Sequence, residues 1–155
     1  MSKAVMFDCY NTLLRYESEE EKAGIWKMMK EAIEYTTGMK LLLLSNAQNC
    51  FIYNELPVEI RKMFDVVIIS EEVGIKKPAP EVFGLAFEKL DMKPEDTVFV
   101  GDSLEDDMIP SGKLGCHCIM IGKEEKKTPE LSHVIHFNPY KESGYTGLAE
   151  NIAAI

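Results

Sequence analysis

The sequence has no hydrophobic run long enough to cross a membrane. Its longest apolar stretch, Met39–Leu44, contains a lysine and is far shorter than the roughly 20 residues that a membrane helix needs. The N-terminus also lacks the apolar core of a signal peptide, since only the short run Ala4–Phe7 follows the first lysine. We therefore expect a cytoplasmic protein with no membrane partner.

Basic residues are scarce. Lysine and arginine number 17 against 26 for aspartate and glutamate, which gives a net charge of −9. Because contacts to a nucleic-acid backbone require clustered lysine and arginine, we expect no nucleic-acid partner. The excess of carboxylates is compatible with a bound divalent cation. The densest acidic cluster, Glu17–Glu21, fits the start of a helix, where the helix dipole favours negative charge.

The four cysteines form no Cys-x-x-Cys pair, so a structural zinc site is not expected. Cys116 and Cys118 flank a histidine, but they also open an apolar run that ends at Ile121. We interpret them as buried thiols on one face of a strand. The chain has no internal repeat or linker, and its length predicts a single domain, residues 1–155.

Apolar runs and helical patterns alternate along the chain. Buried strands are predicted at 4–7, 39–44, 65–69, 97–100 and 116–121, with 133–137 as a sixth candidate. Helices are predicted at 17–37, at 48–64 with a break near Pro57, from Pro78 to Leu90, at 105–114 and at 147–154. This alternation predicts an α/β fold, a three-layer, doubly wound, Rossmann-like parallel sheet of about five strands with helices on both faces.

Asp8 ends the first apolar run. In open α/β sheets ligands bind outside the carboxyl ends of the strands, so a carboxylate at this position is a candidate for chemistry. The structural alternative is that Asp8 caps the following turn, since aspartate often binds the backbone just downstream. Two other predicted strands also end in polar pairs, Ser45-Asn46 and Asp102-Ser103. Their recurrence at one edge of the sheet favours a site.

Four motifs resemble those of the haloacid dehalogenase superfamily of hydrolases. Segment 8–13 (Asp-Cys-Tyr-Asn-Thr-Leu) is similar to the nucleophile motif, and segment 41–46 to the second motif, an apolar strand ending in Ser or Thr. Segment 74–83 is similar to the third motif, in which a lysine precedes Pro-x-Pro, and segment 100–107 to the acidic fourth motif. The resemblance extends from about residue 3 to residue 121, and it implies that the nucleophile strand is central in the sheet.

The resemblance implies a hydrolase in which Asp8 attacks the substrate and forms an aspartyl intermediate that water later hydrolyses. Ser45 and Asn46 would bind the transferred group. Lys77 would bind it as well, and would neutralise charge on both nucleophile and phosphate. Lys76 is the rival candidate, although the family pattern favours the lysine directly before the proline.

A magnesium site is also implied by the resemblance. Asp8, Asp102 and the backbone carbonyl of Tyr10 would present oxygen ligands to Mg²⁺, which prefers such ligands. Asp106 or Asp107 would lie just outside them and orient water molecules or the lysine.

Tyr10 departs from the pattern of the family's phosphatases, which carry a second aspartate there as general acid and base. Such help is worth about 10²–10⁴-fold in rate. Tyr10 could donate its own proton, but a tyrosine here is similar to the family's 2-haloacid dehalogenases, which use the aspartate without metal. Asp102 instead favours Mg²⁺ and phosphate. The interpretations are therefore a Mg²⁺-dependent phosphatase, a metal-free dehalogenase, or a weakly active or inactive member that acts by binding.

The spacing of the motifs leaves no room for a cap domain. Between Asp8 and Ser45, and between Ser45 and Lys77, the chain is long enough only for ordinary crossovers. We expect an open site that accepts a small phosphorylated molecule or a phosphate exposed on a larger substrate. The alternatives are a lid contributed by a second copy in a homo-oligomer, or a cap that was lost or excised near Gly38.

Cys9 and Arg15 have the Cys-x5-Arg spacing of cysteine-dependent phosphatases. That loop wraps a phosphate with backbone N–H groups and favours small residues for close approach. The intervening residues here contain no glycine and two leucines. Asp8 is therefore favoured over Cys9 as the nucleophile.

Overall fold

The computed structural model describes residues 3–9, 12–13, 18, 20, 33–34, 36, 38–122, 134–138 and 144–155. Its centre is a six-stranded sheet in the order β3-β2-β1-β4-β5-β6, in which every pair of neighbours is parallel. The strands are β1 Ala4–Phe7, β2 Lys40–Ser45, β3 Val66–Ile69, β4 Thr97–Gly101, β5 His117–Ile121 and β6 Val134–Phe137. The α/β fold is confirmed, the sixth candidate strand is present, and β1 lies in the interior of the sheet.

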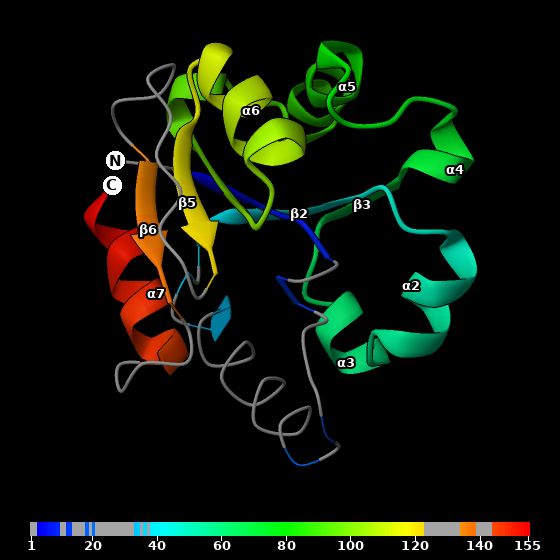
Figure 1. The fold of residues 1–155 in the computed structure, drawn as a ribbon, viewed down its shortest axis with the longest axis horizontal. Helices are drawn as coiled ribbons and strands as arrows, with labels where there is room; N and C mark the ends of the chain where they lie inside the picture. Colours follow the sequence, from blue (N-terminus) through cyan, green and yellow to red (C-terminus); the bar gives the residue numbers. More distant parts are fainter. Residues whose placement is uncertain are drawn as a thin grey trace.

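Helices cover both faces of this sheet (Figure 1). α5 Pro80–Leu90 and α6 Ile109–Lys113 lie on one face (Figure 1), where α5 shares a core cluster with Met6 of β1. α2 Asn49–Glu55, α3 Val58–Arg61 and α7 Gly144–Ala154 pack on the other, in a cluster with Val5 and Phe7. A parallel sheet that is covered in this way has buried strands, and all four residues of β1 are buried.

The sequence pattern of α5 explains its position. Pro80 lies in its first turn, where the missing N–H costs no hydrogen bond, and Asp91 ends it in a left-handed conformation with φ of 52°. The predicted apolar stripe of this helix is buried against the sheet; its members are Val82, Phe83, Ala86, Phe87 and Leu90. Burial of one face of α5 fixes the loop that precedes it, which carries Lys77.

The helix predicted at 105–114 is in fact two elements, a π-helical turn at Leu104–Met108 and then α6. Pro110 lies in the first turn of α6 and has no N–H to continue a ladder of hydrogen bonds from the preceding turn. The closing helix also begins earlier than expected, at Gly144. The helix predicted at 17–37 lies largely outside the described residues.

Between β2 and α5 the described chain contains α2, α3, β3 and a short helix, α4 Ser70–Val73, and no inserted domain. These elements form the ordinary crossover connections of a parallel sheet. No helix among the described residues is long and apolar enough to span a membrane.

Candidate active site

Adjacent strands bring Asp8 and Asp102 together. β1 and β4 are neighbours with Phe7 opposite Val100, and the N–H of Asp8 donates to the carbonyl of Val100 at 2.9 Å. Each aspartate directly follows the last residue of its strand, at the edge of the sheet where ligands bind in open α/β folds.

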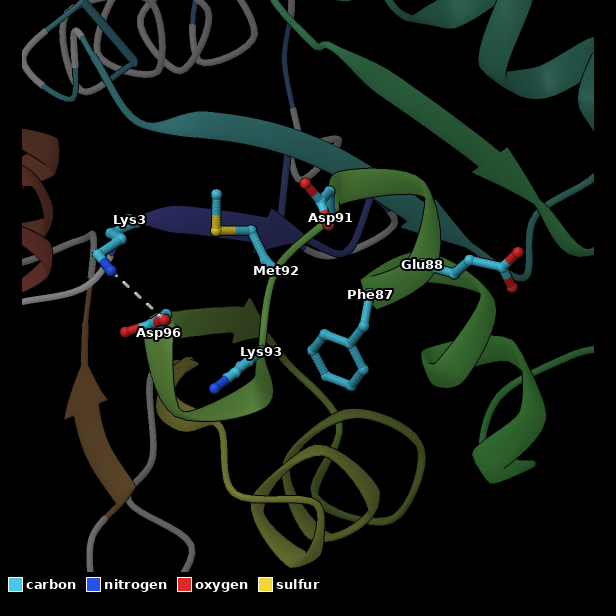
Figure 2. Close-up of a pocket in the computed structure, with 7 residues that line it drawn as sticks. All are labelled: Lys3, Phe87, Glu88, Asp91, Met92, Lys93 and Asp96. Carbon is cyan, nitrogen blue, oxygen red and sulfur yellow. Dashed lines mark ion pairs between the residues drawn. The ribbon is translucent and has the colours of Figure 1, made fainter.

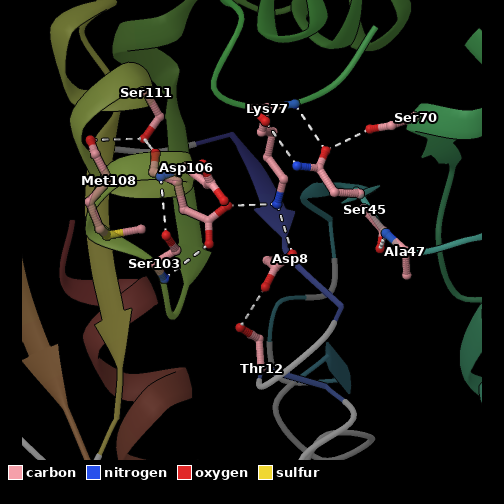
Figure 3. A network of polar contacts seen from close by, with 12 residues as sticks. Asp8, Thr12, Ser45, Ala47, Ser70, Lys77, Ser103, Asp106, Met108 and Ser111 are labelled. Carbon is pink, nitrogen blue, oxygen red and sulfur yellow. Dashed lines mark hydrogen bonds and ion pairs between the residues drawn. The ribbon is translucent and has the colours of Figure 1, made fainter. Parts of the chain in front are cut away.

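Lys77 reaches this edge from the loop between α4 and α5. Its side chain lies between two carboxylates, with Nζ 2.7 Å from Oδ1 of Asp8 and 2.6 Å from Oδ1 of Asp107 (Figure 3). Nζ also lies 5.7 Å from the centre of the Phe99 ring, within the range of a cation–π contact. Lys77 is 3% exposed, whereas Lys76 is exposed. The geometry therefore distinguishes between the two candidate lysines and selects Lys77.

Burial and charge shift the pKa values of this cluster. Burial raises the pKa of Asp8 to about 6 against the opposing effect of Lys77, and burial likewise raises the pKa of Asp107 to about 6. Burial alone would lower the pKa of Lys77, but the charges of Asp8 and Asp107 outweigh it and raise that pKa. The lysine thus remains a cation at neutral pH.

The cluster has too little positive charge for its carboxylates. Oxygen atoms of Asp8, Asp102 and Asp107 all lie within 4.8 Å of one another, and within this group Lys77 is the bridging cation. Buried charges without a partner are costly, so three carboxylates around one ammonium favour a further cation. Oxygen donors at this spacing suit a hard divalent ion such as Mg²⁺. The residues therefore fit the expected metal.

The structure distinguishes Asp107 from Asp106. The π-helical turn directs Asp107 inward, where its Oδ2 accepts the N–H of Ser103 at 3.2 Å and its Oδ1 accepts Lys77. Asp106 is half-buried, and its N–H donates to the hydroxyl of Ser103. Asp107 therefore holds the lysine in place, while Asp106 contributes its backbone to the turn.

Two residues of the site had no predicted role. The hydroxyl of Thr12 lies 3.3 Å from Oδ2 of Asp8, on the side away from Lys77 (Figure 3). Gly101 is needed because a Cβ there would lie 2.5 Å from Oδ2 of Asp107. Thr12 belongs to the nucleophile motif and Gly101 to the acidic motif, so both were visible in the sequence as motif members.

Ser45, Asn46 and Tyr10 complete the set of predicted residues. Ser45 is fully buried, and its hydroxyl accepts the N–H of Ala47 at 3.1 Å. The side chain of Asn46 binds the backbone of Lys77. Tyr10, predicted to supply a metal ligand and a proton, lies outside the described residues.

Cys9, Cys116 and Cys118 are buried free thiols, as predicted for the last two. Burial raises the pKa of the Cys9 thiol, and the adjacent Asp8 carboxylate raises it further. Because the thiolate is the nucleophilic form, Cys9 is unsuited to attack a phosphate.

A separate pocket of about 500 Å³ lies at the amino-terminal end of the strands, away from this cluster (Figure 2). Its lining residues come from the region around the start of β1 and the connection from α5 to β4; they are Lys3, Phe87, Glu88, Asp91, Met92, Lys93 and Asp96. Lys3 and Asp96 pair across it at 3.6 Å. None of the residues predicted to act on a substrate lines this pocket.

The fold and the lysine-bridged cluster together define a doubly wound α/β protein with a carboxylate site at the carboxyl edge of its sheet. The sequence matches the haloacid dehalogenase-like hydrolase family over residues 2–121, and the chain belongs to that family.

Curated relatives of the chain include phosphatases. It is 39% identical over 72 residues to glyceraldehyde 3-phosphate phosphatase of Methanopyrus kandleri, a match that covers 45% of this chain and 31% of that protein. It is 40% identical over 73 residues to phosphoglycolate phosphatase of Salmonella typhi, covering 46% and 29%. The chain thus spans less than a third of the length of either relative.

Solved structures share the fold at low identity. A HAD phosphatase from Thermococcus onnurineus has a TM-score of 0.72 and 18% identity, over 97% of both chains. A 2-haloacid dehalogenase from Pseudomonas syringae pv. Tomato DC3000 has a TM-score of 0.77 and 15% identity, over 99% of both chains. Proteins named for both reactions share this fold, so the fold alone does not choose between them.

Replacing Gly101 by alanine tests the close approach of Asp107. We expect Gly101→Ala to lower the free energy of unfolding by about 1–3 kcal/mol, because the added methyl group must displace a buried carboxylate. Gly84 in α5 is the matched control, since its Cβ would meet nothing within 4 Å. Gly84→Ala should stabilise the helix by roughly 0.5–1 kcal/mol. Equal effects of the two variants in urea denaturation would contradict the packing described here.

The raised pKa values predict an unusual pH dependence of stability in the metal-free protein. A carboxyl with a higher pKa in the folded state binds more protons when folded, so its contribution to stability falls as the pH rises. For Asp107 this interval extends from its ordinary value of 3.8 to about 6. In EDTA, the stability of the wild type relative to Asp107→Asn should therefore fall as the pH rises through this interval. A difference that is constant or rises would show that the pKa of Asp107 is not raised.

Proposed function

We propose that the chain is a Mg²⁺-dependent phosphatase that acts through a phospho-aspartyl intermediate on Asp8. The supporting observation is the group of three carboxylates whose oxygens lie within 4.8 Å of one another, bridged by one buried lysine. This arrangement suits a site that receives both a divalent cation and an anionic phosphoryl group. Phosphoryl transfer depends mainly on such positioning and charge neutralisation.

In the proposed reaction an oxygen of Asp8 attacks the phosphorus atom, and the bond from phosphorus to the departing oxygen breaks. Lys77 stays protonated and neutralises charge on the nucleophile and on the phosphoryl oxygens. Ser45 and Asn46 bind the phosphoryl group from the end of β2. Water then attacks the phosphorus of the acyl phosphate, releases inorganic phosphate and restores the Asp8 carboxylate, with its proton passing to solvent.

The metal would be held by Asp8, Asp102 and the backbone carbonyl of Tyr10. Asp107 would keep its ion pair with Lys77 and would not bind the metal directly. When bound, Mg²⁺ supplies charge neutralisation for the carboxylates and for the phosphate. Thr12 orients the Asp8 carboxylate from the other side through its hydroxyl.

Tyr10 is the proposed donor of a proton to the departing oxygen, and the resulting phenolate regains a proton from solvent before the next turnover. An unshifted phenol has a pKa near 10 and is a poor base at neutral pH. We therefore expect slow turnover and a preference for esters with good leaving groups, because these need little acid help. The phosphatase names of the relatives support a small phosphorylated molecule as the substrate.

A screen of phosphate esters, with Mg²⁺ or with EDTA, tests the proposal. We expect hydrolysis of activated esters such as p-nitrophenyl phosphate with Mg²⁺ and its loss in EDTA. Asp8→Asn should lower the rate on the order of 10³-fold or more, because it removes the nucleophile and retains the shape. Cys9→Ala should remain active.

Three other results would contradict the proposal, each in a different way. Halide release from 2-haloacids without metal would indicate a dehalogenase. Activity that disappears in Cys9→Ala and survives in Asp8→Asn would indicate a cysteine enzyme. No turnover of either substrate class by a folded wild-type protein would indicate a role in binding.

A further inference from the structure

Lys77 has a long and flexible side chain, so its ammonium group occupies one position only if its backbone is fixed. A displacement of about 1 Å at a reacting group can cost on the order of 10²-fold in rate. The ion pairs with Asp8 and Asp107 hold the end of the side chain. The backbone of Lys77 is held by a separate set of polar contacts.

A single side-chain amide binds both backbone polar groups of Lys77. Oδ1 of Asn46 accepts the N–H of Lys77 at 2.9 Å, and Nδ2 of Asn46 donates to the Lys77 carbonyl, also at 2.9 Å. The two bonds fix the plane of the lysine backbone in the way a neighbouring strand would. Asn46 directly follows β2, so these two hydrogen bonds attach the loop that carries Lys77 to the edge of the sheet.

Ser70 fixes the orientation of this amide. Its hydroxyl donates to Oδ1 of Asn46 at 2.7 Å, and the residue is only 7% exposed (Figure 3). An asparagine amide can be turned over, which exchanges its donor and acceptor ends. Two donors, from Ser70 and Lys77, converge on Oδ1 and favour the one orientation in which Nδ2 faces the Lys77 carbonyl.

We infer that Ser70 and Asn46 are positioning residues that set the place of the Lys77 ammonium between Asp8 and Asp107. The inference rests on the proposed function, in which Lys77 neutralises the phosphoryl group. It adds a role for Asn46 beyond substrate binding, and it assigns a role to Ser70, which begins α4 and belongs to none of the four motifs. The three residues come from the ends of β2 and β3 and from the loop before α5, so tertiary structure alone brings them together.

Chemical acylation measures the position of Lys77 without requiring catalysis. In the wild type, acetic anhydride should modify exposed Lys76 and spare buried Lys77, and peptide mass spectrometry resolves the two. We expect Asn46→Ala and Ser70→Ala to raise the ratio of Lys77 to Lys76 acylation several-fold. Ser70→Thr retains the hydroxyl and should keep the ratio near that of the wild type.

Thr97→Ala is the matched control. Thr97 is a fully buried hydroxyl residue that donates to the carbonyl of Lys93 at 3.0 Å, at the opposite edge of the sheet. Its loss should affect stability to a similar degree and leave the acylation ratio unchanged. A ratio that rises equally in Thr97→Ala would mean general loosening of the fold, and it would overturn the inference.

Kinetics separate positioning from substrate binding. With an active ester, Ser70→Ala should lower kcat about tenfold, the effect of one lost hydrogen bond to a buried partner, and leave KM within about twofold. Wild-type acylation ratios in both Ser70→Ala and Asn46→Ala would overturn the inference, even if the enzyme is active. An inactive wild type would refute the proposed function, whereas the acylation experiment would still decide whether these residues position Lys77.

Discussion

The site depends on the contact of one buried ammonium with two buried carboxylates. Lys77 bridges Asp8 and Asp107 at 2.7 and 2.6 Å, and without it these charges would lack a partner in a region of low dielectric constant. The bridge nevertheless leaves the group with Asp102 short of positive charge. The expected metal follows from this imbalance, because a divalent cation would offset the excess negative charge. Only with that charge offset can an anionic phosphoryl group approach the carboxylates.

The fold supplies this arrangement through the parallel sheet. The order of β2, β1 and β4 places the carboxyl ends of three strands side by side, and β1, which leads into Asp8, lies in the middle of them. The remaining members arrive from connections: Lys77 from the loop before α5, and Asp107 from the π-helical turn Leu104–Met108 that follows β4. Gly101 allows Asp107 to approach the strand closely, and the hydroxyl of Ser111 supports the turn by donating to the Asp107 carbonyl.

The sequence predicted the parallel sheet and its helices because burial leaves a strong local pattern of apolar residues. This pattern is a continuous run in β1 and a stripe at helical spacing in α5. The motif resemblance identified Asp8, Lys77 and Asp102, which the structure brings to one edge. It left open the choice between Asp106 and Asp107, since neighbouring acidic residues differ only in the direction that the backbone gives them. The π-helical turn decides this, and no periodic pattern encodes such a turn. The contacts of Ser70 with Asn46 join residues 24 positions apart, so they depend on the path of two loops.

Trapping the phosphorylated enzyme tests whether Asp8 is the nucleophile. The protein would be incubated with Mg²⁺ and acetyl phosphate, and then treated with borohydride, which reduces an aspartyl phosphate to homoserine. Peptide mass spectrometry would locate the change. We expect homoserine at position 8 in the wild type and none in Lys77→Ala, because the nucleophile needs the neutralising ammonium. Turnover without any change at Asp8, or a phosphoryl group on Cys9, would contradict it.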